Sequence, residues 1–345
     1  MQEYGWSPEW EAAFLASGHA GVPGRVIAQH RDGYRVATSR GEITALPSGR
    51  FRHDTGDSGR PAVGDWVILN ETRIVAVLPR KSAFERRAAG TEVRGQVVAA
   101  NIDAVWVISS AGQGANPRRL ERYVALAWES GAVPVVVLTK ADTVTDLEGE
   151  VAGARQVAPG VDVVIVSATR GDGLDQLRTR LRPGETIVLL GPSGVGKSTL
   201  VNTLAGCEIL ATGDVDDAGK GRHTTTHREL VPLLDGALLL DTPGMRELGL
   251  WAGDTGLELA FADIAALAEG CRYRDCLHRT EPGCAVLEAV EKGMLDAARL
   301  ESWHKLHKEA EWVASLNDPL LARERKLSDR AGAKAAEARI RDKRG

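Results

Sequence analysis

Five short runs of Val, Ile and Leu constrain the fold of this chain more than any other feature of its sequence. The runs lie at residues 105–110, 133–140, 161–168, 186–191 and 237–241. They are continuously apolar rather than alternating, and helical stretches separate the first four of them. Continuous apolar strands that are joined by helices indicate a parallel sheet that is buried on both faces. The sequence therefore predicts a central α/β domain.

A different strand pattern precedes these runs. Five short alternating segments, broken by turn residues, lie at residues 24–30, 34–39, 42–47, 64–70 and 73–79. Five short strands in so few residues predict a small closed β-barrel of the OB-fold type. An SH3-like barrel is the alternative, and the sequence separates the two poorly.

The residues before the barrel are predicted to form a short helix. Ser7-Pro8 is a typical helix start, and Trp6, Trp10 and Phe14 lie on one side of the helix that would follow. We interpret residues 1–20 as a helical extension.

Charge is unevenly distributed along the chain. The net charge of −4 does not by itself predict a nucleic-acid partner. Two segments are nevertheless basic: residues 80–87, and residues 319–345, which carry nine Lys or Arg against four acids. We interpret the first as a linker or as part of an RNA-binding face, with Phe84 as a tether from the surface to the core. The second is either a solvated helical tail or a phosphate-binding segment.

The loop after the fourth apolar run matches a phosphate-binding motif. Its residues, GPSGVGKST in sequence, are Gly191, Pro192, Ser193, Gly194, Val195, Gly196, Lys197, Ser198 and Thr199. The loop follows a strand and precedes a helical stretch, which is the setting that a Walker A loop requires. Its backbone N–H groups and the helix N-terminus would bind phosphates. We expect Lys197 to reach the β- and γ-phosphates and Ser198 to bind Mg²⁺.

Two later segments fit the phosphate end of the same site. The fifth apolar run ends in the sequence DTPG, where Asp241 is expected to hold Mg²⁺ and the Gly244 N–H to contact the γ-phosphate. Residues 219–227 are rich in Gly and polar residues and indicate a switch loop. Thr225 or Thr226 would complete the Mg²⁺ ligands, and Thr225 is our first choice.

A phosphate-binding loop does not distinguish ATP from GTP, so the base must be read elsewhere. The second apolar run ends in the sequence TKAD, which is Thr139, Lys140, Ala141 and Asp142. Asp142 can accept hydrogen bonds from guanine N1–H and the 2-amino group, which adenine does not offer in that geometry. Lys140 would lay its aliphatic stem along the base. Ser167 and Ala168 end the next run and would offer a backbone N–H to guanine O6. Taken alone, TKAD could equally be a helix N-cap by Asp142.

The order of these elements predicts a circular permutation. Ordinary GTPases place the phosphate-binding loop first and the base-recognition strands last, whereas here the base elements at 139–168 come first. The segment after Gly244 then leads directly into the C-terminal region. Our hypothesis is that a shift that depends on the γ-phosphate is passed to residues 253–345.

The C-terminal region contains a cluster of metal-ligand residues. Cys271, Cys276, His278 and Cys284 supply three thiolates and one imidazole within 14 residues. Four such ligands satisfy tetrahedral Zn²⁺ without an open position, so we predict one structural zinc ion per chain. The remaining cysteine, Cys207, is interpreted as a core residue.

These motifs together resemble one family. The matching sequences are VGDWV in the barrel, TKAD ahead of GPSGVGKST, GRHTTTH, DTPGMRELGL and CRYRDCLHRTEPGC. Over nearly its whole length the chain resembles the RsgA (YjeQ) family of circularly permuted GTPases, which depend on the small ribosomal subunit. The resemblance implies GTP hydrolysis that the small subunit stimulates, a role in the late maturation of that subunit, and rRNA contacts from the barrel and the zinc domain. A GTPase switch that acts on another RNA or ribonucleoprotein is the alternative.

Two positions bear on catalysis. Met245 follows Gly244, where many GTPases carry a glutamine that orients water, so we expect slow intrinsic hydrolysis that depends on a partner. His223 resembles the family's proposed substitute, although a loop histidine can also be merely solvated. With Lys197 it forms our predicted catalytic set. Thr139 stands where many GTPases have Asn, so its contact is expected to be weaker.

The length of 345 residues suits several domains. We predict an N-terminal helical extension (1–20), an OB-fold barrel (21–95), a circularly permuted P-loop GTPase domain (96–252) and a mainly α-helical zinc-binding domain with a basic tail (253–345). The expected cofactors are Zn²⁺, and Mg²⁺ with GTP. The expected partners of a monomeric chain are GTP or GDP, the small ribosomal subunit with its rRNA, and other subunit-maturation factors. No stretch is apolar enough to span a membrane and the N-terminus lacks a signal-peptide pattern, so the cytoplasm is the expected location.

Overall fold

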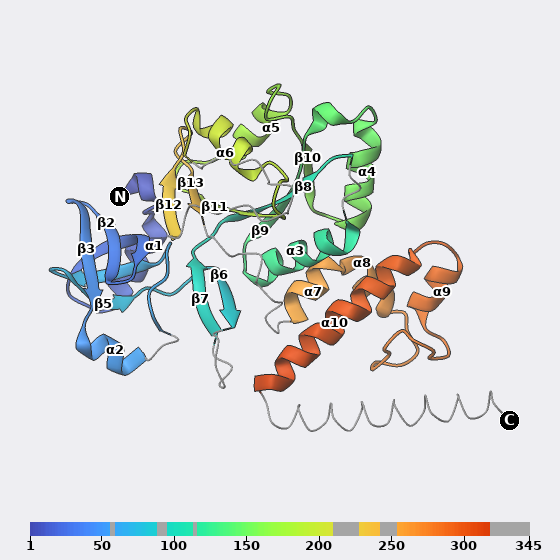
Figure 1. Cartoon of the computed structure of the whole chain (residues 1–345). Coiled ribbons are helices and arrows are strands. Elements are labelled where there is room, and N and C mark those ends of the chain that lie inside the picture. The colour runs from blue at the N-terminus through green and yellow to red at the C-terminus, as the bar shows by residue number, and fades with distance from the viewer. Residues whose placement is uncertain (56–58, 88–94, 113–115, 210–227, 242–253, 318–345) are drawn as a thin grey trace.

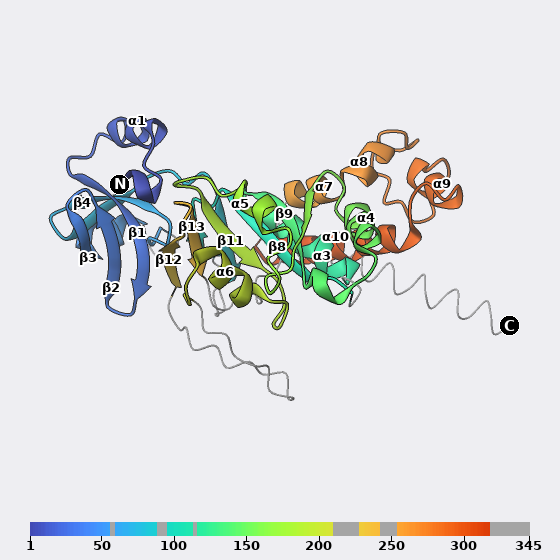
Figure 2. The same ribbon diagram turned by 90° about the horizontal axis from the view of Figure 1, so that it is seen from above.

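The computed structural model describes residues 1–55, 59–87, 95–112, 116–209, 228–241 and 254–317 (Figure 1). The barrel lies at one end of the molecule, the α/β domain in the middle, and the C-terminal helices at the other end, in both views (Figure 2). No helix among the described residues is long and apolar enough to cross a membrane.

The barrel contains the five strands that the alternating segments predict. They are β1 (Val22–His30), β2 (Gly33–Thr38), β3 (Gly41–Pro47), β4 (Trp66–Asn70) and β5 (Arg73–Val77). The strands follow the order β1-β2-β3-β5-β4, and β4 pairs with β1 to close the barrel. The parallel pairing of β3 with β5 gives the OB-fold order and decides against the SH3-like alternative. A short helix, α2 (Gly49–Thr55), connects β3 towards β4.

The N-terminal segment packs against the barrel. It contains a 3-10 helix, η1 (Gln2–Tyr4), and the predicted helix, α1 (Pro8–Ala16). The fully buried ring of Trp66 lies 4.7 Å from the ring of Trp6 and 6.0 Å from that of Trp10, measured between centroids. Ser7 occupies the N-cap position, as predicted. Its hydroxyl, however, makes no capping hydrogen bond.

The basic segment after the barrel forms a hairpin that the sequence did not indicate. Strand β6 (Ala83–Arg87) pairs with β7 (Gly95–Ala100) in an antiparallel sheet. Phe84 is buried in the core, as the tether interpretation predicts. Arg80 donates to both carboxylate oxygens of the buried Asp65, at 2.8 and 2.7 Å, so this arginine holds the barrel to the hairpin. The alternative of an RNA-binding face remains a prediction.

Each of the five apolar runs supplies one parallel strand of the α/β domain. The strands are β8 (Ala104–Ser110), β9 (Val133–Thr139), β10 (Asp162–Ile165), β11 (Thr186–Leu190) and β13 (Leu238–Asp241). They follow the order β10-β9-β8-β11-β13. A sixth strand, β12 (Arg228–Pro232), was not predicted; it pairs antiparallel with β13 and with β1, and so joins this sheet to the barrel.

Both faces of the parallel sheet are covered by helices, as continuous apolar runs require. The helices are α3 (Pro117–Glu129), α4 (Leu147–Val157), α5 (Leu174–Arg178) and α6 (Lys197–Ala205). Along β8, Val105 and Val107 enter the core that contains Leu120 of α3. Trp106 and Ile108 enter a second core with Leu200 of α6.

The described part of the C-terminal region is helical, as predicted. Its helices are α7 (Asp254–Ala260), α8 (Ala262–Ala268), α9 (Ala285–Glu291) and α10 (Ala297–Asn317). Helix α7 meets α3 closely, because a Cβ atom added at Gly256 would lie 2.6 Å from the Ala125 carbonyl oxygen. The basic segment 319–345 lies outside the described residues.

Candidate functional site

The phosphate-binding loop has the backbone that its glycines allow. It connects the end of β11 to the first residue of α6, Lys197. Gly194 and Gly196 have left-handed φ angles of 76° and 92°, which side chains other than glycine adopt only at a cost. A Cβ atom at Gly191 would lie 2.5 Å from the carbonyl oxygen of Ile108 on the neighbouring strand. All three predicted glycines are therefore required by the local geometry.

Lys197 lies across the start of this loop. Its Nζ donates to the carbonyl oxygens of Gly191 at 2.8 Å and of Pro192 at 2.6 Å. The ammonium group thus lies against the start of the loop, and its contact with the β- and γ-phosphates remains a prediction. Ser193 and Thr199 are exposed and Ser198 is half-buried, so the loop and the helix N-terminus face solvent.

The base end of the site lies at the ends of β9 and β10. Lys140 takes a left-handed φ of 60°, and a 3-10 turn, η2 (Ala141–Thr143), follows it. The Ser167 hydroxyl donates to Oδ1 of Asp142 at 2.6 Å. This hydrogen bond is the main cause that lowers the pKa of Asp142, with a smaller contribution from nearby Arg170. Asp142 is therefore kept ionised, which is the form that accepts two hydrogen bonds from guanine.

Backbone hydrogen bonds also hold Ala141 and Ser167, two further residues of the predicted base-recognition set. The Ala141 N–H donates to the Val166 carbonyl at 3.0 Å, which fixes the turn that carries Asp142. The Ser167 N–H donates to the Asp172 carbonyl at 2.9 Å, which leaves the Ala168 N–H as the candidate for the predicted contact to guanine O6. The sequence did not indicate that the Ser167 side chain would hold Asp142. Their places at the ends of adjacent parallel strands are the signal that could have shown it.

One hydrogen bond joins the base end to the phosphate end. The Thr139 Oγ1 donates to the carbonyl oxygen of Val195 at 2.5 Å, and Thr139 is buried. Elements that are more than 50 residues apart in sequence are thereby fixed against each other. Thr139 thus links its strand to the phosphate-binding loop, and the weaker contact expected of Thr in place of Asn remains a prediction.

Several predicted residues lie outside the described part of the chain. These are His223, Thr225, Thr226, Gly244 and Met245. Asp241 is the last residue of strand β13, which lies between β11 and β12 in the sheet. Their roles in binding Mg²⁺, the γ-phosphate and the attacking water remain predictions.

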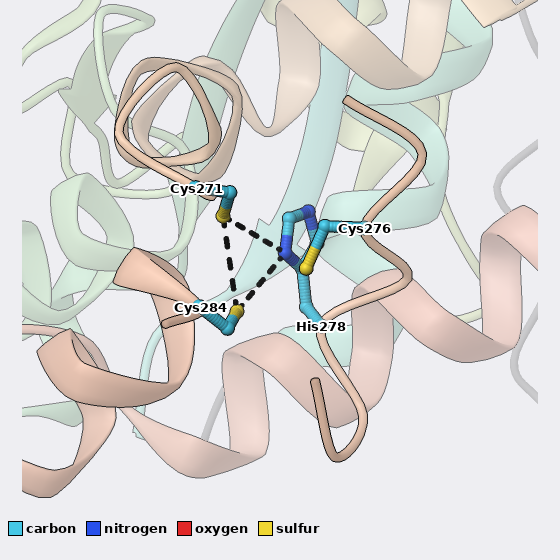
Figure 3. A group of neighbouring side chains, drawn as sticks. All are labelled: Cys271, Cys276, His278 and Cys284. Carbon is cyan, nitrogen blue, oxygen red and sulfur yellow. Dashed lines mark hydrogen bonds between the residues drawn. The ribbon is translucent and has the colours of Figure 1, made fainter. Parts of the chain in front are cut away.

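The four predicted zinc ligands converge between the C-terminal helices (Figure 3). The ligand atoms of Cys271, Cys276, His278 and Cys284 all lie within 4.8 Å of one another. The Cys271 and Cys284 sulfur atoms are 3.8 Å apart, and His278 Nδ1 lies 3.6 Å from the first and 3.3 Å from the second. Tetrahedral zinc with Zn–S bonds of about 2.3 Å places two sulfur ligands roughly 3.8 Å apart. The donor set and its spacing therefore fit a closed, structural zinc site.

Local backbone features shape this cluster. His278 has a left-handed φ of 55° and is buried. Cys284 is the N-cap of α9, where its sulfur accepts from the Leu287 N–H at 3.4 Å. Glu281 accepts hydrogen bonds from backbone N–H groups of the intervening loop, which lower its pKa to about 2. Cys207, in contrast, is exposed, so its interpretation as a core residue is wrong; it follows the end of α6, after the helix has left the core.

Comparison with known proteins agrees with this geometry. The family model described as RsgA GTPase matches residues 77–251. The chain is 44% identical over 338 residues to the small ribosomal subunit biogenesis GTPase RsgA 2 of Lactiplantibacillus plantarum, which covers 96% of this chain and 95% of the relative. It is also 44% identical over 342 residues to the small ribosomal subunit biogenesis GTPase RsgA of Opitutus terrae, covering 94% of this chain and 93% of the relative.

Two solved structures share the fold. The crystal structure of YjeQ from Thermotoga maritima superposes with a TM-score of 0.63 at 25% identity, and covers 84% of this chain and 98% of that protein. The structure of YloQ, a circularly permuted GTPase, gives a TM-score of 0.59 at 25% identity, and covers 85% of this chain and 96% of that protein. The permuted order of the nucleotide site, the cysteine and histidine cluster and these similarities lead to one conclusion: the chain belongs to the RsgA family of GTPases.

Proposed function

We propose that this GTPase binds the small ribosomal subunit and assists its late maturation, and that the subunit stimulates the hydrolysis of GTP to GDP and phosphate. The observation that supports the proposal best is the buried hydrogen bond from Thr139 to Val195, because it joins the strand end that precedes Asp142 to the loop that precedes Lys197. The relatives from L. plantarum and O. terrae, which match nearly the whole chain, bear the name of small ribosomal subunit biogenesis GTPases.

The binding step uses both ends of this pocket. Asp142 and the Ala168 N–H select guanine, and Lys140 covers one face of the base. The amides of the phosphate-binding loop and the Lys197 ammonium hold the phosphates. Ser198, Asp241 and Thr225 or Thr226 would hold Mg²⁺, which supplies positive charge to the β- and γ-phosphates when bound.

In the hydrolytic step, a water oxygen forms a bond to the γ-phosphorus while the bond to the bridging oxygen breaks, and GDP leaves. Lys197 stabilises the charge that grows on the phosphate oxygens. Met245 has no hydrogen-bonding group to orient the water. We propose that His223 takes this role when the ribosomal subunit is bound.

A conformational change at the nucleotide site would reach the C-terminal domain through the segment that directly connects them. Strand β13 ends at Asp241, and α7 begins at Asp254. Helix α7 packs directly on α3 through Gly256, whose N–H also donates to Glu129 at 2.9 Å. A rearrangement near Gly244 would therefore act on a helix that is in contact with both domains. Comparing hydrogen exchange of residues 254–317 in the GTP- and GDP-bound protein tests this; equal exchange rejects it.

The barrel supplies a surface that suits rRNA. Helix α2 exposes Arg50 with 93% and His53 with 89% of their side-chain surface in solvent, both beside Asp54, and Arg52 is also exposed. Such a basic surface favours phosphate backbones. We also propose the domain limits 1–20, 21–95, 96–252 and 253–345, a monomeric chain, a cytoplasmic location, and contact with other maturation factors.

The test is GTP hydrolysis measured alone and with purified small subunits, large subunits or free rRNA. We expect only the small subunits to raise the turnover rate by tenfold or more, since partner-supplied stabilisation in GTPases has effects of this order or larger. Equal stimulation by large subunits or free RNA would support a different ribonucleoprotein target. No stimulation by any of them contradicts the proposal.

A further inference from the structure

Helix α3 has two opposite faces with different partners. Arg118, Glu121, Arg122 and Ala125 follow the i, i+3, i+4, i+7 spacing of one face, and all of them lie against C-terminal helices. Asn116, Arg119, Leu120 and Tyr123 follow the same spacing on the opposite side. These four residues line a cavity next to the phosphate-binding loop. One helix thus touches the C-terminal domain and the nucleotide site.

Three charged contacts attach the first face to α10. Arg118 donates to Glu301 at 2.8 Å, and Arg122 makes a two-pronged contact with Glu309 at 2.9 and 2.6 Å. These pairs are partly exposed. The third, from Arg299 to Glu121, is buried, with 7% and 3% of the side-chain surface exposed. We call these three pairs the α3–α10 clamp.

Arg299 is the centre of this clamp. All five of its N–H donors are used: Nε and one terminal nitrogen bind Asp263, and the others bind Glu121 and the carbonyl oxygens of Val157 and Ala260. Its acceptors come from α3, α4, α7 and α8. A planar guanidinium with every donor occupied fixes these helices in one arrangement. Movement of α10 must therefore move α3 or break buried hydrogen bonds.

The opposite face of α3 lies beside the phosphate end of the pocket. The cavity there has a volume of about 220 Å³, and Pro192 and Val195 of the phosphate-binding loop share its lining with Arg119. Lys197 Nζ is 2.6 Å from the carbonyl oxygen of Pro192. Lys197 is expected to reach the β- and γ-phosphates, so the cavity that Arg119 lines lies beside the loop that is proposed to bind them.

We propose that Arg119 is a catalytic residue that acts in cis on the phosphates of GTP, and that the α3–α10 clamp sets its position. The guanidinium would stabilise the negative charge that builds up on the γ-phosphate oxygens and the leaving β–γ bridging oxygen. It gains and loses no proton, since arginine stays charged throughout the accessible pH range. An arginine supplied within the same chain fulfils this role in some GTPases, and it matters more where Met245 leaves the water without a glutamine.

The first test is single-turnover hydrolysis of GTP by the full chain without any partner. We expect Arg119→Ala to lower the rate at least about tenfold, a modest share of what an arginine contributes in a complete GTPase site. The dissociation constant of GTP should stay within about threefold, because the charge acts mainly in the transition state. Arg119→Lys should recover part of the rate by restoring the charge without the planar fork.

The second test is a double-mutant cycle between Arg119 and the clamp. The clamp variant carries Arg122→Ala and Glu309→Ala together, so that no unpaired charge remains in this half-exposed pair. It should lower the rate severalfold in the native background and have no further effect when Arg119→Ala is present. Arg155→Ala, an exposed position on α4, is the matched control and should leave the rate unchanged.

These outcomes are decisive in both directions. An unchanged rate in Arg119→Ala rejects the catalytic role, and additive effects in the cycle reject the link to the clamp. Both measurements use GTP hydrolysis without ribosomal subunits. They therefore succeed or fail separately from the proposed stimulation by the small subunit.

Discussion

At the scale of single residues, the nucleotide site depends on Thr139. Its buried hydroxyl donates a hydrogen bond from the end of β9 to the phosphate-binding loop at Val195. Threonine lacks the side-chain amide of the more common asparagine, and its hydroxyl donates a short hydrogen bond to the Val195 carbonyl oxygen.

Thr139→Val tests this bond while keeping the shape of the side chain. Removing the hydroxyl leaves the Val195 carbonyl without its buried donor, which should cost about 1–3 kcal/mol of folding free energy. We also expect weaker GTP binding, because the two ends of the pocket lose their link. Urea unfolding and nucleotide titration measure the two effects. Thr179→Val, at an exposed threonine on the end of α5, is the control; an equal loss in the control would refute the argument.

Residue types at the site were predictable, and their partners were not. Asp142, Lys197 and the three loop glycines follow from short motifs with known chemistry. The bond between Ser167 and Asp142 depends on how two strand ends meet in space. The exposure of Cys207 depends on where α6 ends relative to the core. The neighbouring residues in the sequence indicate neither this hydrogen bond nor this exposure.

At the scale of elements, the apolar runs predicted the parallel strands, whereas two strands without such runs were not predicted. Strand β12 has the sequence RELVP, which contains few apolar residues and ends in proline, and only its pairing with β13 and β1 makes it a strand. Strand β6 is charged and was interpreted as a linker. Strands of this kind depend on tertiary contacts more than on propensity.

The zinc cluster is the element whose loss should have the largest effect. The loop between α8 and α9 carries Cys271, Cys276, His278 and Cys284, whose ligand atoms lie within 4.8 Å of one another. Removing zinc with a chelator, or Cys284→Ser, should unfold the C-terminal helices, since structural zinc contributes on the order of 10 kcal/mol to such sites. Circular dichroism with metal analysis would show the loss. Cys207→Ser should leave both signals unchanged; bound zinc at full occupancy in Cys284→Ser would contradict the site.

At the scale of the whole molecule, Arg25 joins three parts of the chain. This buried arginine on β1 donates to the carbonyl oxygens of Tyr4 at 2.8 Å and Asn101 at 3.2 Å, and to the Thr186 hydroxyl at 2.9 Å. Burial lowers the pKa of its guanidinium to about 10, so it remains charged at neutral pH. No sequence pattern could identify this role, since its acceptors lie 21, 76 and 161 residues away.

Arg25→Met should loosen the barrel from the GTPase domain. It removes three hydrogen bonds and leaves their acceptors without donors in a buried junction, a loss of about 3–5 kcal/mol by comparison with other buried charged contacts. Thermal unfolding and limited proteolysis between residues 95 and 104 would detect it. Arg73→Met, at an exposed position on β5, is the matched control. Identical stability of the two variants would show that Arg25 does not hold the junction.

The proposed function depends on one pocket in which Asp142 would read guanine while Lys197 would hold the phosphates. Asp142→Asn reverses the hydrogen-bonding character of one carboxylate oxygen, so it should no longer match guanine N1–H and the 2-amino group. Binding of GTP and of xanthosine triphosphate should be measured for the native chain and the variant by the same titration. We predict that the native chain prefers GTP and that the variant prefers xanthosine triphosphate. An unchanged preference for GTP in Asp142→Asn would contradict the shared pocket.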